Sequence, residues 1–309
     1  MMRVVRHSLT DLPADVIDDR IGDSVLASRG FMSLWQSQGG TPVAWTAEEG
    51  DTVVAILPGV EFGMAGVRRF QSMPDGLYTR VFTDDNAGQS RGYLASQLVR
   101  AVRAYGYSKI FLYDFYGHLE ECEGFDSVEH ETSVVDISSP EWQPPDKKLQ
   151  SEIRKAEREG ITITSIEPGR HLGKFLALMR ETETRHKRQQ KYSDGFFAHL
   201  AELSTRDNRI LWLWCEHEGS GAASHIFLVE GEMALHWQVY FDKQFSFLKP
   251  NQYILYRQAK ELQARGVTRL NLGASLPEAA GLRAYKGKWG GEAVRYRSCV
   301  RRSGIGKLL

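Results

Sequence analysis

Two stretches of the sequence decide the fold. The first, GYLASQLVRAVRAYGYSKIFL, runs from Gly92 to Leu112, and the second, QYILYRQAKELQARGVTRLNL, runs from Gln252 to Leu272. They align without a gap, and Gly106 falls opposite Gly266. Each predicts an amphipathic helix, then a glycine at the helix C-terminus, then a short strand, because glycine adopts the left-handed conformation that ends many helices. The chain therefore contains a helix–glycine–strand unit twice.

A hairpin precedes this unit in both halves of the chain. Residues 41–57 and residues 210–228 each have the pattern of a strand, a polar turn and a second strand. Between the halves lies the stretch Ser138–Asp146, which has three prolines and few apolar residues, as is typical of a linker. We therefore predict two copies of a mixed α/β unit, at residues 1–140 and 145–309.

The composition is that of a soluble protein with no overall attraction for polyanions. The chain has 309 residues, of which 42% are hydrophobic and 25% charged, and 39 basic side chains balance 39 acidic ones. This length suits two domains. Because the net charge is zero, nucleic acid would have to bind a local basic patch.

Cysteine usage and hydropathy exclude several classes. The three cysteines, Cys122, Cys215 and Cys299, are odd in number and far apart, so they predict neither a disulfide framework nor a metal site. The N-terminus has no apolar run of signal-peptide length, and no stretch of 18 apolar residues occurs. We expect a cytoplasmic protein without an integral membrane segment, whereas its oligomeric state cannot be predicted.

The order of motifs in the second half resembles a known family. The motifs are IRKAEREGI (153–161), YSDGFF (192–197), PNQYIL (250–255), GVTRLNLG (266–273) and GLRAYKGKWGG (281–291). Together they are similar to the Fem-like branch of the GNAT acyltransferase superfamily, which includes the peptidoglycan-bridge aminoacyltransferases. The resemblance covers residues 150–293, and the first half matches by its order of elements.

The resemblance implies a fold and an activity. The fold is α/β (α+β), with tandem GNAT-like domains that each have a mixed, mostly antiparallel sheet flanked by helices, the second being the catalytic half. The activity is transfer of an acyl or aminoacyl group to a primary amine. The donor would be aminoacyl-tRNA, and the acceptor a small peptide or a cell-wall precursor. Two alternatives stay open: an N-acyltransferase that depends on acyl-CoA, and a non-catalytic tandem-GNAT binding module.

The start of the helix at residue 250 helps to identify the acyl donor. We expect no cofactor, and the donor, aminoacyl-tRNA or acyl-CoA, would act as a co-substrate. Many acetyltransferases hold the CoA pyrophosphate on backbone N–H groups of a glycine-rich loop at a helix N-terminus. Here the stretch 247–253 contains no glycine, and Pro250 lacks an N–H group. This departure favours aminoacyl-tRNA over acyl-CoA.

Amide formation requires a group that stabilises negative charge and a group that accepts a proton, but no metal. The family has a lysine directly after an aromatic residue, and Tyr285 and Lys286 match this pair. The resemblance therefore implies that both are candidate site residues. The Lys286 ammonium would bind a phosphate or the developing oxyanion, and Arg283 would share the phosphate. The alternative for both cations is a solvated turn.

The strand at residues 234–241 suggests the acid–base groups. Its alternation predicts that His236 and Tyr240 lie on the same face, where His236 would accept a proton and Tyr240 would donate one. A structural, hydrogen-bonded histidine is the alternative. Asn271, on the following strand, is a candidate for orienting the substrate.

Further candidates lie in basic runs and at a strand end. The runs 185–192 and 295–302 could receive a tRNA, although charged helix ends and strand faces also explain such runs. Arg185 matches an arginine of the family pattern and is expected to bind substrate or support the cleft. Asp114 could contact the acceptor amine, or it could cap a turn.

Overall fold

The protein consists of two compact units in the computed structural model. The structure describes residues 2–303, except 14, 15, 17–19, 23, 65, 66, 79, 85–87, 120, 121 and 277. The first unit comprises Met1–His130 together with Arg295–Leu309, and the second comprises Glu131–Val294. Two units were predicted, but the division differs from the predicted 1–140 and 145–309. The C-terminal residues belong with the first unit, because residues 297–302 form a strand of its sheet.

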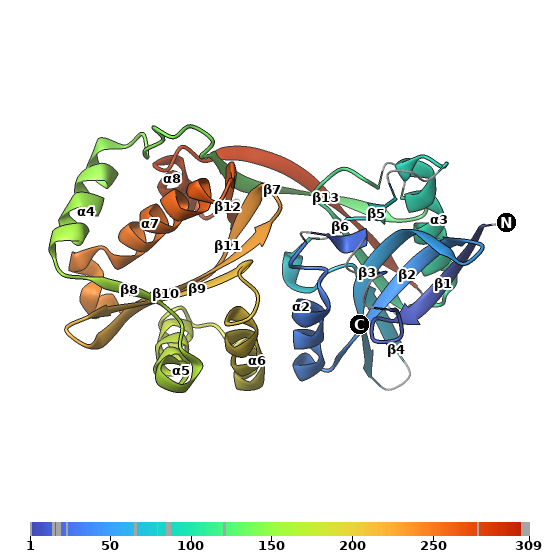
Figure 1. Ribbon diagram of the computed structural model, residues 1–309, viewed down its shortest axis with the longest axis horizontal. Coiled ribbons are helices and arrows are strands. Elements are labelled where there is room, and N and C mark those ends of the chain that lie inside the picture. Colours follow the sequence, from blue (N-terminus) through green and yellow to red (C-terminus); the bar gives the residue numbers. More distant parts are fainter. Residues whose placement is uncertain are drawn as a thin grey trace. The chain divides into compact units, whose positions relative to one another are not determined.

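The sheet of the first unit is mostly antiparallel (Figure 1). In spatial order its strands are β1 (Met2–Ser8), β2 (Gly40–Glu49), β3 (Thr52–Met64), β4 (Val67–Gln71), β6 (Lys109–Asp114) and the C-terminal part of β13 (Glu292–Arg302), and β5 (Phe82–Thr83) pairs with β3. The pair β4–β6 is parallel. The helices are α2 (Arg29–Ser33), η1 (Leu34–Gln38), η2 (Pro74–Gly76) and α3 (Arg91–Ala104).

The core of the first unit lies between α3 and the sheet. Leu94, Leu98 and Val102 lie on one side of α3 and pack on buried side chains of the strands. Cys122 and Cys299 belong to this cluster and form a disulfide, with 6.3 Å between their Cα atoms. The number and spacing of the cysteines did not predict this disulfide. The pairing of β13 with β6 brings Cys299 to the loop after β6 that contains Cys122, although the two cysteines are 177 residues apart in the sequence, and Cys215 has a free thiol.

The second unit has helices on both faces of its sheet (Figure 1). In spatial order the strands are the C-terminal part of β7 (Asp126–Asp136), then β12 (Arg269–Ala274), β11 (Met233–Phe241), β10 (Ser220–Glu230), β9 (Ile210–His217) and β8 (Thr162–Ser165). Helices α4 (Lys147–Arg158) and α7 (Pro250–Ala264) cover one face. Helices α5 (Pro168–Arg185) and α6 (Asp194–Ser204) cover the other. The short helices η3 (Lys243–Leu248) and α8 (Ala280–Gly287) complete the unit.

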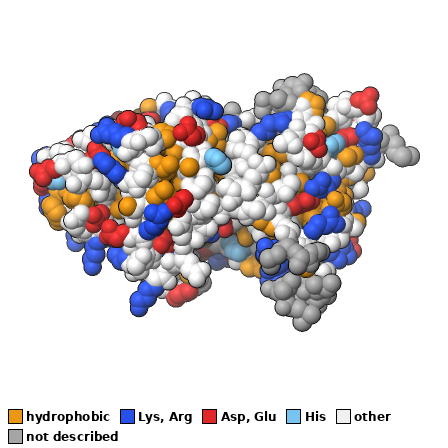
Figure 2. Space-filling view, turned by 90° about the horizontal axis from the view of Figure 1, so that it is seen from below, with side chains coloured by type: hydrophobic (Ala, Val, Ile, Leu, Met, Phe, Trp, Pro, Cys, Tyr) orange, Lys and Arg blue, Asp and Glu red, His pale blue; other side chains and the backbone are white. Residues whose placement is uncertain are grey.

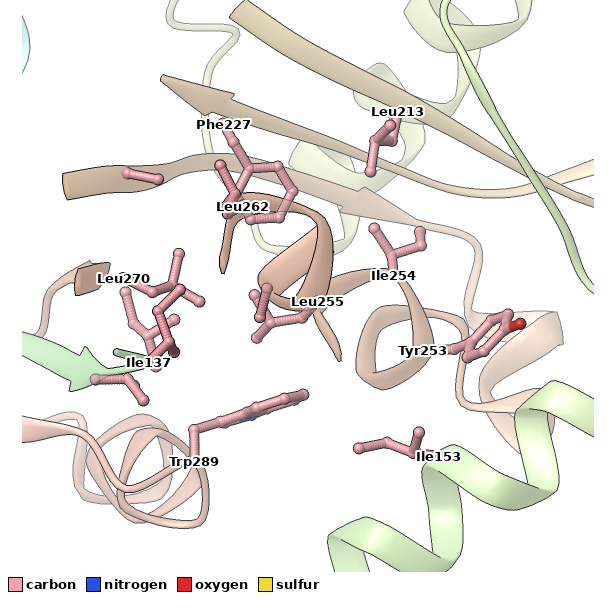
Figure 3. Close-up of a cluster of buried hydrophobic side chains, with 14 of the residues drawn as sticks. Ile137, Ile153, Leu213, Phe227, Tyr253, Ile254, Leu255, Leu262, Leu270 and Trp289 are labelled. Atoms are coloured by element: carbon pink, nitrogen blue, oxygen red, sulfur yellow. The ribbon is translucent and has the colours of Figure 1, made fainter. Parts of the chain in front are cut away.

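The core of the second unit is built around α7. Ile254, Leu255 and Leu262 of this helix pack against Phe227 and Leu270 of the sheet (Figure 3). Trp289 closes the cluster and is fully buried. The tryptophan of the sequence GLRAYKGKWGG is therefore a core residue, and it fixes α8 against the rest of the unit.

The structure confirms the predicted duplication. In the first unit α3 is followed by Gly106 and β6, and in the second α7 is followed by Gly266 and β12. Both glycines have positive φ angles, of 90° and 83°, as the helix-ending role requires. The hairpins β2–β3 and β9–β10 precede them. Each copy thus joins a parallel strand pair, β4–β6 or β11–β12, through a crossover helix.

Charge is spread evenly over the visible surface. Figure 2 shows basic and acidic side chains interspersed on both units, as the balanced composition predicts. No helix within the described residues has the length and apolar character to cross a membrane.

Candidate active site

The candidate site lies where two central strands of the second unit separate. Strands β11 and β12 pair in parallel over three residues only, with Leu235 opposite Asn271 as the last pair. His236 is the next residue of β11, so it lies at the point where the strands begin to diverge. Lys286, on α8, bonds to the backbone of Gly273 and Ala274 at the end of β12. Three elements, β11, β12 and α8, therefore bring a histidine, a lysine and polar backbone groups to one place.

A β-bulge determines which side chains of β11 reach this place. Gln238 lies opposite Ile226 of β10, but His236 lies opposite Phe227, so Trp237 is an extra residue. A bulge shifts the alternation of side chains by one position. His236 consequently lies on the α7 face, where its ring stacks on Phe227 with 4.5 Å between centroids.

Tyr240 lies on the opposite face. Its ring packs on Phe175 of α5 and Phe197 of α6, and its hydroxyl donates to Gln238 Oε1 at 3.0 Å. Burial raises its pKa. The prediction that His236 and Tyr240 share a face is wrong, because the bulge at Trp237 lies between them. Tyr240 is a core residue here and not an acid facing the site.

His236 belongs to a chain of hydrogen bonds. Its Nε2 atom lies 3.0 Å from Nδ1 of His225, whose Nε2 atom lies 2.9 Å from Oδ1 of Asn251. An amide oxygen only accepts, so His225 carries its proton on Nε2 and accepts on Nδ1. His236 must then donate from Nε2. The lone pair of neutral His236 is therefore on Nδ1.

Both imidazoles are neutral at physiological pH. Burial lowers the pKa of His225 to about 4. Burial, followed by electrostatic repulsion from the neighbouring His225 and Lys286 whenever these are protonated, lowers the pKa of His236 well below its ordinary value. His225 is buried, whereas His236 keeps partial exposure. His236 can therefore present an unprotonated nitrogen at the place where β11 and β12 diverge.

Lys286 is buried and fully hydrogen-bonded. Its Nζ atom donates to the carbonyl oxygens of Gly273 and Ala274, at 2.6 and 2.9 Å, and to Ser275 Oγ at 2.8 Å. An ammonium group has three N–H donors, so all three are used. Burial lowers its pKa to about 8. Lys286 thus holds the segment after β12 and supplies a positive charge, and direct contact with a substrate oxygen requires the exchange of one of these bonds.

Asn271 supports the backbone on the other side of this segment. It is completely buried, and its Oδ1 atom accepts from Thr132 Oγ1 at 2.6 Å and from the Gly273 N–H at 2.8 Å. Asn271 thus binds the N–H group of Gly273, and Lys286 binds the carbonyl group of the same residue. This geometry gives Asn271 a positioning role, while a direct contact with substrate stays a prediction.

The other predicted residues are dispersed. Arg185 donates to the carbonyl of Phe241 at 3.0 Å and lies over its ring, so it supports the end of β11. Arg283 is exposed on α8, and half-buried Tyr285 packs on the core of the second unit. Asp114, in the first unit, accepts from the backbone N–H groups of His118 and Leu119, which is the turn-capping alternative.

Sequence reasoning missed His225, Asn251, Ser275 and Thr132. His225 and Asn251 precede and follow the predicted strand of His236. Asn251 lies in the motif PNQYIL, but that motif gave it no role of its own. The signal that could have found His225 is a histidine in the neighbouring apolar strand, because paired strands bring such residues together. Ser275 and Thr132 lie in segments without a motif.

The architecture is that of an α/β protein built from two related units, with a polar site in the second. Residues 146–287 match the family model of the acetyltransferase (GNAT) domain. This match confirms the expectation of an acyltransferase and assigns the GNAT domain to the second half of the chain. The sequence matches none of the curated proteins.

Solved structures support the same relationship at the level of fold. FemX superposes with a TM-score of 0.71 at 12% identity, over 95% of this chain and 96% of that chain. A putative lysylphosphatidylglycerol synthetase C-terminal domain from Agrobacterium fabrum gives 0.63 at 16% identity, over 95% and 94% of the two chains. A tandem GNAT protein from the clavulanic acid biosynthesis pathway gives 0.56 at 10% identity, over 98% and 99%. The predicted tandem, Fem-like GNAT fold is confirmed.

Proposed function

We propose that this protein transfers an acyl group, carried as an aminoacyl ester on tRNA, to a primary amine. The observation that supports this most directly is the chain Asn251–His225–His236. It keeps an imidazole neutral, fixes its tautomer and leaves its Nδ1 atom as a proton acceptor. An attacking amine needs such an acceptor, because it becomes positively charged as its bond to carbon forms.

The reaction balances without any other reactant. The amine nitrogen attacks the ester carbonyl, and a new N–C bond forms while the carbonyl oxygen becomes negative. His236 accepts a proton from the nitrogen. The C–O bond to the donor then breaks, and the proton passes to the departing ribose oxygen. Lys286, whose charge lies beside His236, favours the negatively charged intermediate.

The first turn of α7 supports aminoacyl-tRNA as the donor. The carboxylate of Glu152 lies 3.3 Å from Lys249 Nζ and 3.4 Å from Gln252 Nε2, both at the start of this helix. Pro250 occupies the first helical position, and the Asn251 side chain is bound to His225. A helix N-terminus attracts a pyrophosphate through free N–H groups and positive charge. A carboxylate and a proline at this position disfavour that ligand.

The acceptor that we propose is a peptide with a primary amine, such as a cell-wall precursor. The support is the motif order shared with the Fem-like branch and the overall fold shared with FemX. The fold is also shared with the C-terminal domain of a lysylphosphatidylglycerol synthetase. The alternative is an acyl-CoA-dependent N-acyltransferase, which the match to the acetyltransferase domain favours.

The test is a transfer assay with two donors and one variant pair. Purified protein is incubated with labelled aminoacyl-tRNA or acetyl-CoA and a panel of amino-terminal peptides. We expect amide product from the tRNA ester and none from acetyl-CoA. His236→Gln keeps a donor toward His225 but removes the proton acceptor, so the rate should fall by about a hundredfold or more. The control His199→Gln changes an exposed histidine on α6 and should keep full activity.

Each outcome bears on one part of the proposal. Transfer from acetyl-CoA alone would contradict the donor and support the alternative. Full activity of the His236 variant would contradict the assigned proton acceptor, whichever donor is used. Absence of transfer from both donors across the peptide panel would contradict the proposed reaction.

A further inference from the structure

Three cations share one rung of the sheet in the first unit. Lys109 of β6 lies opposite Arg69 of β4 on one side and opposite Arg302 of β13 on the other. Arg69 and Arg302 are exposed, and Lys109 is half-buried. Like charges directly opposite one another across strands destabilise a sheet. We call these three residues the cation rung.

The cation rung is not neutralised within the described part of the chain. None of its three side chains has a carboxylate partner there. Glu61, on the neighbouring rung, already accepts hydrogen bonds from Nε and Nη2 of the Arg6 guanidinium, each at 2.7 Å, and it also accepts from the Tyr107 hydroxyl. An external anion would therefore relieve the repulsion among three cations.

A row of aromatic rings continues from the cation rung along the same face. Phe111 and Tyr113 follow Lys109 at alternate positions of β6, and their rings are 6.4 Å apart with planes inclined by only 8°. The row continues through His130 and Tyr296 to Phe115. The ring centroids of His130 and Tyr296 are 5.1 Å apart, and those of Tyr296 and Phe115 are 5.5 Å apart. We call these five residues the ring row.

The ring row is accessible, although it consists of side chains that usually pack inside. All five of its side chains are half-buried and none is fully covered. The opposite face of β6 carries Ile110 and Leu112, which lie in the core under α3. The ring row is therefore not required for that core, and the proposed reaction in the second unit does not use it.

We propose that this face of the first unit binds a single-stranded polynucleotide segment, with phosphates at the cation rung and bases along the ring row. Proteins that bind single strands combine cations that follow the backbone with aromatic side chains on which bases stack. Lys109 joins the two parts, because its Nζ atom lies 4.9 Å from the centre of the Phe111 ring. The identification of the strand as the end of the donor tRNA rests on the proposed function.

The charge distribution indicates which end of this surface favours phosphates. The negative charge of Asp75 acts on Tyr113 and contributes, after burial, to raising its pKa. A phosphate is therefore disfavoured beside Tyr113 and favoured at the opposite end of the surface, at Lys109. Uncharged bases are the parts of a nucleotide that fit the rings near Asp75.

The repeat of the rings favours a strand over a single nucleotide. Residues on the same face of a β-strand repeat about every 7 Å, so β6 alone presents rings at two successive positions. His130 and Tyr296 extend the row beyond β6. One base would cover only part of this surface, whereas consecutive bases would use all of it.

The test measures binding of the full chain to a fluorescein-labelled RNA of sequence ACCA by fluorescence anisotropy, with no acceptor present. Three phosphate contacts predict that the logarithm of the affinity falls with the logarithm of salt concentration with a slope of about −2. Lys109→Gln should reduce the slope by about 0.7. Phe111→Leu keeps an apolar side chain but removes a stacking ring, and should weaken binding about fivefold or more.

Matched controls and competitors decide the outcome. Lys148→Gln on α4 and Tyr93→Leu on α3 change an exposed cation and an exposed ring elsewhere, and should leave binding unchanged. Binding that is salt-independent, or equally strong in the Lys109 variant, would overturn the proposal. Equal competition by inorganic tetraphosphate would remove the role of the rings, and equal competition by uridine diphosphate would replace the strand with a single nucleotide.

Failure of this proposal is separable from failure of the proposed reaction. Absence of RNA binding with intact amide formation would refute the surface and leave the transferase in place. RNA binding that depends on Lys109 and Phe111, without amide formation from either donor, would support the surface and refute the reaction.

Discussion

Replacement of Lys286 by methionine should change how stability depends on pH. In the folded protein, burial lowers the pKa of Lys286 from an ordinary value of 10.5 to about 8. Below pH 8 the ammonium is charged in both the folded and unfolded states, and the folded state bears the cost of keeping that charge out of water. Between pH 8 and 10.5 the unfolded state binds more protons, so the wild-type free energy of unfolding should rise with pH. Lys286→Met removes this contribution.

The size of the effect follows from the pKa change. The lowering of the Lys286 pKa from 10.5 to about 8 corresponds to a change of about 3 kcal/mol in the free energy of unfolding. The full change is reached when the pH exceeds the pKa of Lys286 in the unfolded state. The variant also loses the hydrogen bonds to Gly273, Ala274 and Ser275, which adds an offset to the difference. The neutral amine has only two N–H groups, and the bond lost on deprotonation is already contained in the pKa. The difference in unfolding free energy between wild type and variant is therefore the quantity to follow.

The assay is urea unfolding of both proteins at intervals from pH 7 to pH 10.5. Other groups titrate in this range, but they titrate in both proteins and cancel in the difference. We expect the wild type to gain about 3 kcal/mol relative to the variant across this range. A difference that does not change with pH would refute the assignment of Lys286 as a buried, weakened base, and a difference that falls with pH would show that the folded state raises its pKa.

Two further predictions concern neighbouring residues. Tyr240→Phe should keep full transfer activity, because the hydroxyl lies on the α5–α6 face and bonds to Gln238 there, and a hundredfold loss in a steady-state assay would contradict this placement. Asn271→Ala should lower the free energy of unfolding by about 1–3 kcal/mol, because the Thr132 hydroxyl and the Gly273 N–H lose their acceptor in a buried place. Chemical denaturation measures this loss, and an unchanged midpoint would contradict the positioning role.

The fold could be predicted from the sequence because its signals are local and repeated. A helix that ends at glycine before a short strand occurs twice, and Gly106 and Gly266 have the backbone conformation that this pattern requires. The disulfide could not be predicted, since it depends on the pairing of β6 with β13 across most of the chain. Cysteine count and spacing carry no information about that pairing.

The candidate site was predicted less completely, for a reason visible in β11. Alternation of side chains predicted one shared face for His236 and Tyr240, and it failed because one extra residue, Trp237, lies between them. A bulge depends on the partner strand as well as on the bulged strand, so the sequence of β11 alone cannot reveal it. Similarly, the partners of Lys286 are mainly backbone carbonyls, which every sequence possesses.

The duplication explains how one scaffold provides two kinds of surface. Aligned on the repeated unit, Asn271 and Gly273 of the second copy correspond to Phe111 and Tyr113 of the first. In the second copy, β11 and β12 separate after Leu235, and Lys286 binds the carbonyl of Gly273.

In the first copy, Ser72 closes the corresponding place. Its N–H donates to the Phe111 carbonyl at 2.8 Å, and its hydroxyl accepts from the Tyr113 N–H at 2.9 Å. In the second copy the strands diverge beside His236, whereas in the first copy the Ser72 bridge ties the segment after β4 to β6 beside Phe111 and Tyr113. The same helix–glycine–strand unit thus carries Gly273 beside the proposed transfer site and Tyr113 in the proposed stacking surface, and the Ser72 bridge accompanies the aromatic residue.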